Sequence, residues 1–121
     1  MIIGVVGGTI EEPRVAYLAE PQAVTDEILT LTEPAAPTEV LRFAAPCVSG
    51  KCKHFDGANC RLVTRVVQLL PKVVDVLPAC RIRSHCRWWR QEGKAACMRC
   101  PQVVTDSYSA SEPLRQAALP E

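Results

Sequence analysis

Aromatic residues and long apolar runs are both scarce in this 121-residue sequence. Only two Phe, two Tyr and two Trp are present, so a core has to be built mainly from aliphatic side chains. Residues 1–10 are apolar, but glycines interrupt them and they lack the cationic start of a targeting segment. They are also far fewer than the ~20 residues that a membrane-spanning helix requires. The sequence therefore predicts a cytoplasmic protein with no membrane contact.

Carboxylates are few in the part of the chain that holds the cysteines, which bears on catalysis. Residues 47–100 contain only Asp56, Asp75 and Glu92, and no arrangement typical of a hydrolase is found there. The glycines within residues 1–8 match neither the G-x-G-x-x-G pattern nor the P-loop pattern. We therefore expect an accessory or electron-transfer protein rather than an enzyme.

Ten prolines divide the chain into short elements, because proline interrupts helix interiors. The length predicts a single domain over residues 1–121. Residues 1–46 would form an acidic β/α part, residues 47–106 a cysteine-rich metal-binding part, and residues 107–121 a flexible tail. The expected fold is small α+β with mainly short helices. In it, an N-terminal β-hairpin-like segment precedes a metal-stabilised, cysteine-rich helical region.

The acidic part is expected to contain two strands and two brief helices. Residues 1–6 and 15–18 are rich in β-branched and apolar side chains, which is typical of strands. Thr25 is expected to cap one helix, and Thr38 a second helix that continues through Phe43.

The clearest helix is expected over residues 61–70, where apolar side chains recur at three- and four-residue steps. Its outer side would carry Arg61, Arg65 and Gln68. A shorter apolar turn is expected over residues 72–77, and a further helix over residues 84–92 that ends at Gly93.

Charge is divided unevenly along the chain, although the net charge is only +1. Residues 47–100 carry eleven basic and three acidic side chains, a balance of +8, whereas residues 1–46 and 101–121 come to −5 and −2. The cationic segment predicts an acidic protein partner, such as a redox enzyme or client. Nucleic acid is the less favoured partner.

All seven cysteines lie in this cationic segment, with the spacing C-x4-C-x7-C-x19-C-x5-C-x10-C-x2-C. In a reducing compartment, clustered thiols are typically metal ligands or redox groups, and an odd number cannot pair fully in disulfides. They divide into a trio and a quartet. The trio is Cys47, Cys52 and Cys60, and the quartet is Cys80, Cys86, Cys97 and Cys100.

Four thiolates are the number that ligates one zinc ion or one four-iron cluster. Cys97 and Cys100 form a C-x-x-C pair, and Pro101 follows it as in the cluster-binding run of bacterial ferredoxins. Zinc modules usually contain two closely spaced pairs, whereas the other intervals here are wide. The spacing therefore favours one or two 4Fe-4S clusters ligated by all seven cysteines, with zinc as the alternative. His54 is either a fourth ligand for the trio or a packing residue.

Three functions are compatible with this pattern. The favoured one is a small iron–sulfur protein that transfers electrons or holds a cluster for a larger partner enzyme, with Trp88 and Trp89 shielding the metal. The alternative is a zinc-stabilised module for protein or nucleic-acid interaction, with a basic and aromatic surface. The third is a thiol oxidoreductase that uses Cys97 and Cys100, although no βαβ pattern surrounds this pair.

Two resemblances accompany the cysteine pattern. Residues 46–106 resemble small cysteine-rich bacterial iron–sulfur proteins of the nitrogen-fixation accessory type. The similarity lies in Cys52-x-His54-Phe55-Asp56-Gly57 and in Cys86-Arg87-Trp88 through Pro101. The count of four plus three and the closing C-x-x-C are similar to the auxiliary-cluster domains of radical peptide-modifying enzymes, which hold two four-iron clusters. The C-x3-C-x2-C signature of the radical enzymes is absent. The resemblances imply an iron–sulfur cofactor but no activity.

Overall fold

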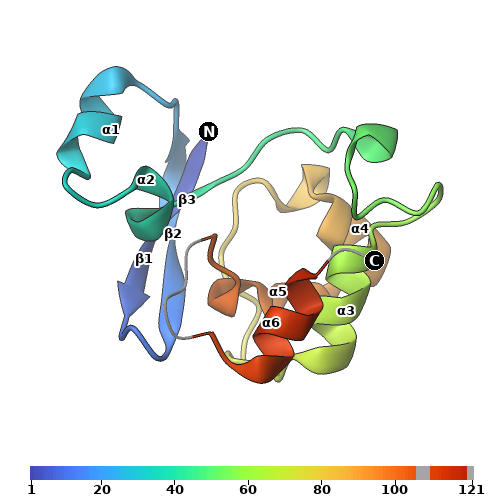
Figure 1. Ribbon diagram of the computed structural model, residues 1–121. Helices are drawn as coiled ribbons and strands as arrows, with labels where there is room; N and C mark the ends of the chain where they lie inside the picture. Colours follow the sequence, from blue (N-terminus) through green and yellow to red (C-terminus); the bar gives the residue numbers. More distant parts are fainter. Residues whose placement is uncertain (106–109, 120–121) are drawn as a thin grey trace.

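The computed structural model describes residues 1–105 and 110–119, which form two parts lying side by side (Figure 1). The N-terminal part is a three-stranded sheet with two short helices, and the second part contains the helices that follow residue 60. This is the small α+β architecture of short helices that the sequence predicts. No helix among the described residues is both long and apolar enough to cross a membrane.

The sheet is antiparallel and has the strand order β2-β1-β3. The central strand β1 (Ile2–Gly8) pairs with β2 (Pro13–Gln22) on one side and with β3 (Leu41–Phe43) on the other. The two strands expected near the N-terminus are thus confirmed, and they form a hairpin. Gly4 is needed where β1 meets β2, because a Cβ there would lie 2.6 Å from Cγ1 of Val15.

The first helix of the sheet part follows the prediction and the second does not. α1 (Asp26–Leu31) begins at Thr25, whose hydroxyl accepts a hydrogen bond from the N–H of Ile28 at 3.2 Å. Thr38 was expected to cap a helix reaching Phe43, which is wrong. α2 (Pro37–Val40) begins before Thr38, and the chain then continues as β3. Pairing with the free edge of β1 gives these residues the backbone hydrogen bonds that a helix would have supplied locally.

The core of the helical part lies between α3 (Arg61–Leu69) and α6 (Glu112–Ala118), which pack against each other. Its buried residues are Val66, Leu70 and Ala117, and Leu62, Trp88, Val103 and Leu114 pack around them. The helix expected over residues 61–70 is confirmed. The sequence did not predict α6, because residues 107–121 were expected to be a flexible tail. Of that expected tail, residues 107–109 and 120–121 lie outside the described residues, as does residue 106.

Arg65 was expected to face outward from α3, and this prediction is wrong. Its side chain is only 9% exposed, because it reaches under α6. There its Nε donates a hydrogen bond to the carbonyl of Ala117 at 2.9 Å. Arg65 thus supplies a hydrogen-bond donor to a backbone carbonyl at the end of α6, a helix far away in the sequence. Helical periodicity does not reveal such a contact.

The remaining elements are single turns and short helices around the cysteines. They are η1 (Ser49–Lys51), η2 (Arg83–His85), α4 (Arg87–Glu92), α5 (Lys94–Cys97) and η3 (Cys100–Gln102). The helix expected over residues 84–92 is therefore split at Cys86, although it does end at Gly93, which has a φ of 66°. Residues 72–77 are not helical. The N–H of Val73 instead donates to the carbonyl of Met98 at 3.0 Å.

The two parts meet where η3 packs against β2. An exposed ion pair between Glu20 and Arg81, 3.2 Å apart, joins them at the surface. The chain between β3 and α3 also passes from the sheet to the helices (Figure 1). These connections bring β2 and β3 against the cysteine-rich segment.

Candidate metal centre

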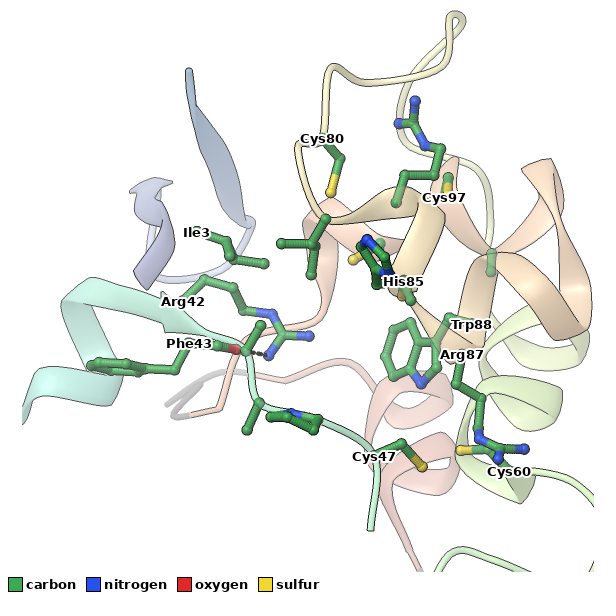
Figure 2. Close-up of a pocket in the computed structure, with 18 of the residues that line it drawn as sticks. Ile3, Arg42, Phe43, Cys47, Cys60, Cys80, His85, Arg87, Trp88 and Cys97 are labelled. Atoms are coloured by element: carbon green, nitrogen blue, oxygen red, sulfur yellow. Dashed lines mark hydrogen bonds between the residues drawn. The ribbon is translucent and has the colours of Figure 1, made fainter. Parts of the chain in front are cut away.

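All seven cysteines line one cavity, of about 380 Å³, between the two parts of the molecule. Both histidines and Trp88 line it as well. Each of the seven cysteines is a free thiol. In Figure 2, Cys80 and Cys97 lie on one side of His85, and Cys47 and Cys60 lie on the other side beside Arg87. The volume is within the range of ~300–1,000 Å³ typical of ligand pockets.

The thiols of the quartet lie close enough to affect one another's ionisation. Burial raises the pKa of the Cys100 thiol, and the nearby Cys86 and Cys80 raise it further. Burial likewise raises the pKa of Cys97, with added contributions from Cys100 and Cys86. The four cysteines predicted as a quartet line the same cavity from the loop before η2, the start of α4, the end of α5 and the start of η3, and their role as ligands of one centre stays a prediction.

The sheet supplies two polar side chains to the quartet. The Tyr17 hydroxyl, from β2, donates a hydrogen bond to the thiol of Cys100, and the charge of Arg42, from β3, also lowers the pKa of that thiol. Burial raises the pKa of Tyr17 above its usual range, and the negative charge of a Cys100 thiolate adds to this effect. Figure 2 shows the Arg42 side chain pointing from the sheet into the cavity.

Arg83 binds the quartet from the helical side. It hydrogen-bonds to Cys97, which offsets part of the rise in the pKa of that thiol. Its Nη2 also donates to the carbonyl of Pro78, and its guanidinium lies 5.5 Å from the ring centroid of Trp89. Cation–π contact and hydrogen bonds thus hold this positive charge beside the C-x-x-C pair.

Cys47 is the exposed member of the set and has the opposite electrostatic environment. The backbone N–H of Ser49 and the Arg87 guanidinium both hydrogen-bond to its sulfur, and they lower the pKa of the Cys47 thiol. Arg87 also donates to the hydroxyl of Ser49 at 3.3 Å and lies 5.1 Å from the ring centroid of Phe55. Two fixed donors therefore favour the thiolate of Cys47.

The other two cysteines of the trio frame a tight loop before α3. Phe55 and Cys60 form an isolated antiparallel bridge, and the N–H of Phe55 donates to the carbonyl of Cys52 at 3.1 Å. Asp56 accepts hydrogen bonds from the N–H groups of Asn59 and Ala58 at 2.8 and 2.9 Å, which close the turn. These backbone and side-chain hydrogen bonds fix the shape of the loop.

His54 lines the cavity but is already engaged. Its Nδ1 lies 3.0 Å from Nη2 of Arg65. Arginine is only a donor, so Nδ1 accepts this bond and the neutral ring carries its proton on Nε2. Burial and the charges of Arg65 and Lys53 lower the pKa of His54, which favours that neutral ring.

Three arginines share an unusual feature at this cavity. Arg42, Arg83 and Arg87 all line it, and the buried Nε of each has no hydrogen-bond partner among residues 1–105 and 110–119. A buried donor without a partner costs about 1–3 kcal/mol. Within residues 1–105 and 110–119, no Asp, Glu or Lys lines the cavity. In the described part of the chain, the site therefore combines thiols with positive charge and has no carboxylate to neutralise it.

The cysteines surround this space without converging on one point. Among residues 1–105 and 110–119, no three or more His, Cys, Asp or Glu side chains form a group that could hold a metal ion. The sequence missed Tyr17 and Arg42 as site residues. Strand periodicity places Tyr17 on the same face as the buried Val15, but it does not reveal that this face meets Cys100.

Comparisons with known proteins add no relative to this description. No protein-family model, no curated protein and no solved structure matches the chain.

Proposed function

We propose that this protein is a small iron–sulfur protein that holds one or two 4Fe-4S clusters and serves electron transfer or cluster holding for a larger partner enzyme. One observation carries the proposal: one cavity is lined by all seven cysteines and by three arginines whose buried Nε atoms have no partner in the described part of the chain. The resemblance of residues 46–106 to nitrogen-fixation accessory proteins agrees with it.

The lining offers the kinds of side chain that suit an anionic cluster, thiols and arginines, although the thiols of the described residues do not form a group that could hold a metal ion. A four-iron cluster with its thiolates is a net anion, and nearby N–H donors and positive charges stabilise such a centre. Arg42, Arg83 and Arg87 offer both, and an anion in the cavity would give their orphan Nε–H groups an acceptor. No carboxylate of the described residues lines the cavity, so among them this positive charge would act on the thiolates and sulfides.

The two cysteine groups suggest different tasks. The quartet supplies four thiolates and is covered by Tyr17, whose hydroxyl donates to Cys100. The trio supplies three and includes the exposed Cys47. A bound cluster supplies one-electron chemistry. The quartet is the better site for stable electron transfer, because none of its cysteines is fully exposed and burial raises the pKa of both Cys97 and Cys100. The trio is the better site for a reaction that needs access from outside.

We further propose a cytoplasmic location and an acidic protein partner. Seven cysteines that all remain free thiols suit a reducing compartment. Lys51, Lys53, Arg61, Arg90 and Lys94 are exposed around the cysteine-rich part, so the positive balance of residues 47–100 reaches the surface. Such a surface attracts an acidic partner and accelerates its association.

Anaerobic purification with metal and sulfide analysis tests this proposal. The expected result is about four or eight iron atoms per chain with equimolar acid-labile sulfide, and a brown protein that becomes paramagnetic on reduction. Cys100→Ser should abolish one cluster, whereas the exposed Arg90→Gln should retain all the iron. Stoichiometric zinc without sulfide would overturn the proposal and support the zinc-stabilised interaction module instead.

A further inference from the structure

We propose that the chain with no metal bound takes a small carboxylic acid with an apolar body into the cavity between the sheet and the helices, and that the carboxylate lies at Arg42. Such binding goes beyond the proposed function and does not rest on it, because it needs only the side chains that the folded chain itself brings to the cavity.

The walls of the cavity suit an apolar molecule. Ile3 reaches it from β1 and Leu62 from α3, and Ile82 and Trp88 line it beside η2 and in α4. Figure 2 shows Ile3 on the sheet side and Trp88 on the helical side. A body that fills a space of about 380 Å³ between such side chains leaves water, which favours binding.

Arg42 gives this apolar space a positive end. Figure 2 shows its side chain pointing from β3 into the cavity. Its Nη1 donates to the carbonyl of Phe43 at 3.1 Å, which holds the guanidinium in place. Its Nε is buried and has no hydrogen-bond partner among residues 1–105 and 110–119. A buried cationic donor without an acceptor is costly, so an anion that reaches it is bound favourably.

The other two arginines of the lining are already engaged with thiols. Arg83 hydrogen-bonds to Cys97 and donates to the carbonyl of Pro78, and Arg87 hydrogen-bonds to Cys47. Both also lie against aromatic rings, Arg83 at Trp89 and Arg87 at Phe55. Arg42 is therefore the arginine on which an incoming anion has the least competition.

The geometry of Arg42 favours a carboxylate in particular. The bond to Phe43 uses Nη1, so it leaves the edge of the guanidinium that carries Nε–H. Arginine binds a planar carboxylate along such an edge through charge-assisted hydrogen bonds. No Asp or Glu of the described residues lines the cavity, so the carboxylate has to come from a ligand.

The experiment titrates the full-length chain, reduced and stripped of metal with a chelator, by isothermal titration calorimetry. Circular dichroism first establishes that the stripped chain is folded. The probe is phenylacetate. Phenylacetamide has the same body without the charge, and acetate has the charge without the body. Phenylacetate should bind saturably, and each analogue should bind at least about tenfold more weakly.

Variants of the arginines locate the carboxylate. Arg42→Gln should weaken phenylacetate binding by at least about tenfold, the loss expected for a charge-assisted hydrogen bond. Arg42→Lys keeps the charge and should lose less. Arg87→Gln, on the helical side of the cavity, should also lose less than Arg42→Gln. Arg90→Gln, exposed on α4, should bind as the wild type does.

The two tryptophans locate the apolar body. Trp88 is among the residues that line the cavity, and Trp89 instead lies against Arg83. Phenylacetate should therefore change the tryptophan fluorescence of the wild type and of Trp89→Phe. The same addition should leave the fluorescence of Trp88→Phe unchanged.

Several results would overturn this binding site. They are equal binding of phenylacetamide, wild-type affinity in Arg42→Gln, a larger loss in Arg87→Gln than in Arg42→Gln, and a stripped chain that is unfolded or binds no phenylacetate. The metal and sulfide analysis tests the proposed function separately. Stoichiometric zinc without sulfide would overturn that function and leave these expectations as they are.

Discussion

The side-chain amide of Gln91 pairs with both backbone polar groups of Cys60, as a neighbouring strand would. The N–H of Cys60 donates to Oε1 at 2.8 Å, and Nε2 donates to the carbonyl of Cys60 at 2.9 Å. Cys60 lies at the start of α3 and Gln91 within α4. This pair therefore fixes the last cysteine of the trio against the helix that carries Arg87.

Replacing Gln91 with alanine should lower the free energy of unfolding by about 2 kcal/mol. The change removes both bonds to Cys60 and a third to the hydroxyl of Thr64 at 3.2 Å, and a typical bond contributes ~0.5–1.5 kcal/mol. Urea denaturation of the metal-free protein measures the effect. Gln68→Ala, at an exposed position of α3, is the control and should change stability by less than ~0.5 kcal/mol. Equal losses in both variants would contradict the assigned role of Gln91.

The metal-free protein should lose stability as the pH rises above the ordinary thiol pKa of ~8.5. Burial raises the pKa of Cys100 and Cys97 in the folded chain, so the unfolded chain releases these protons first. The stabilisation that these two protonated thiols give the fold is fully present below the thiol pKa of the unfolded chain. It is lost as the pH rises to their pKa in the folded chain. Urea midpoints on both sides of ~8.5 test this. Cys100→Ser should flatten the dependence, and an unchanged slope would contradict the assignment.

Cys47 should be the first cysteine alkylated at neutral pH. Cys47 is exposed, and the N–H of Ser49 and the guanidinium of Arg87 lower the pKa of its thiol. Cys100 is half-buried, and burial raises the pKa of its thiol. Limited iodoacetamide treatment of the metal-free protein followed by peptide mass mapping gives the order. Arg87→Gln should slow the reaction at Cys47 at neutral pH but not at alkaline pH. Modification of Cys100 before Cys47 would contradict the electrostatic picture.

Metal loading should stabilise the helical part. A metal that binds only the native state raises its stability by linkage, and the elements around the quartet are single turns and short helices. Cys100→Ser should therefore lose helical circular dichroism and protease resistance over residues 60–100 as well as colour. If the variant loses its metal but keeps the same circular dichroism and melting temperature, the core between α3 and α6 is sufficient alone.

Docking to an acidic partner should weaken as salt is added. The balance of +8 over residues 47–100 acts through exposed side chains, and attraction between exposed charges is screened beyond ~10 Å at 0.1 M salt. Association with candidate reductases can be followed by surface plasmon resonance at several salt concentrations. Reversing Lys94 and Arg90 to Glu should lower the association rate. Salt-independent binding would show that the arginines act on the cavity alone.

The sequence by itself determined the local features of this protein. β-Branched residues specified the β1–β2 hairpin, Thr25 specified the start of α1, and the apolar steps of residues 61–70 specified α3, because each depends on near neighbours in the chain. The cysteine spacing also indicated the division into trio and quartet. These signals are local, so they could be read without the fold.

Only the tertiary structure decided which distant side chains meet the cysteines. Tyr17 and Arg42 come from the sheet, and Arg65 lies under α6 instead of facing solvent, where its Nη2 lies 3.0 Å from Nδ1 of His54. Residues 41–43 became a strand because β1 had a free edge. Each of these outcomes depends on packing between segments far apart in the chain. A periodic pattern shows which face of a helix or strand is apolar, but it does not show which other segment that face will pack against.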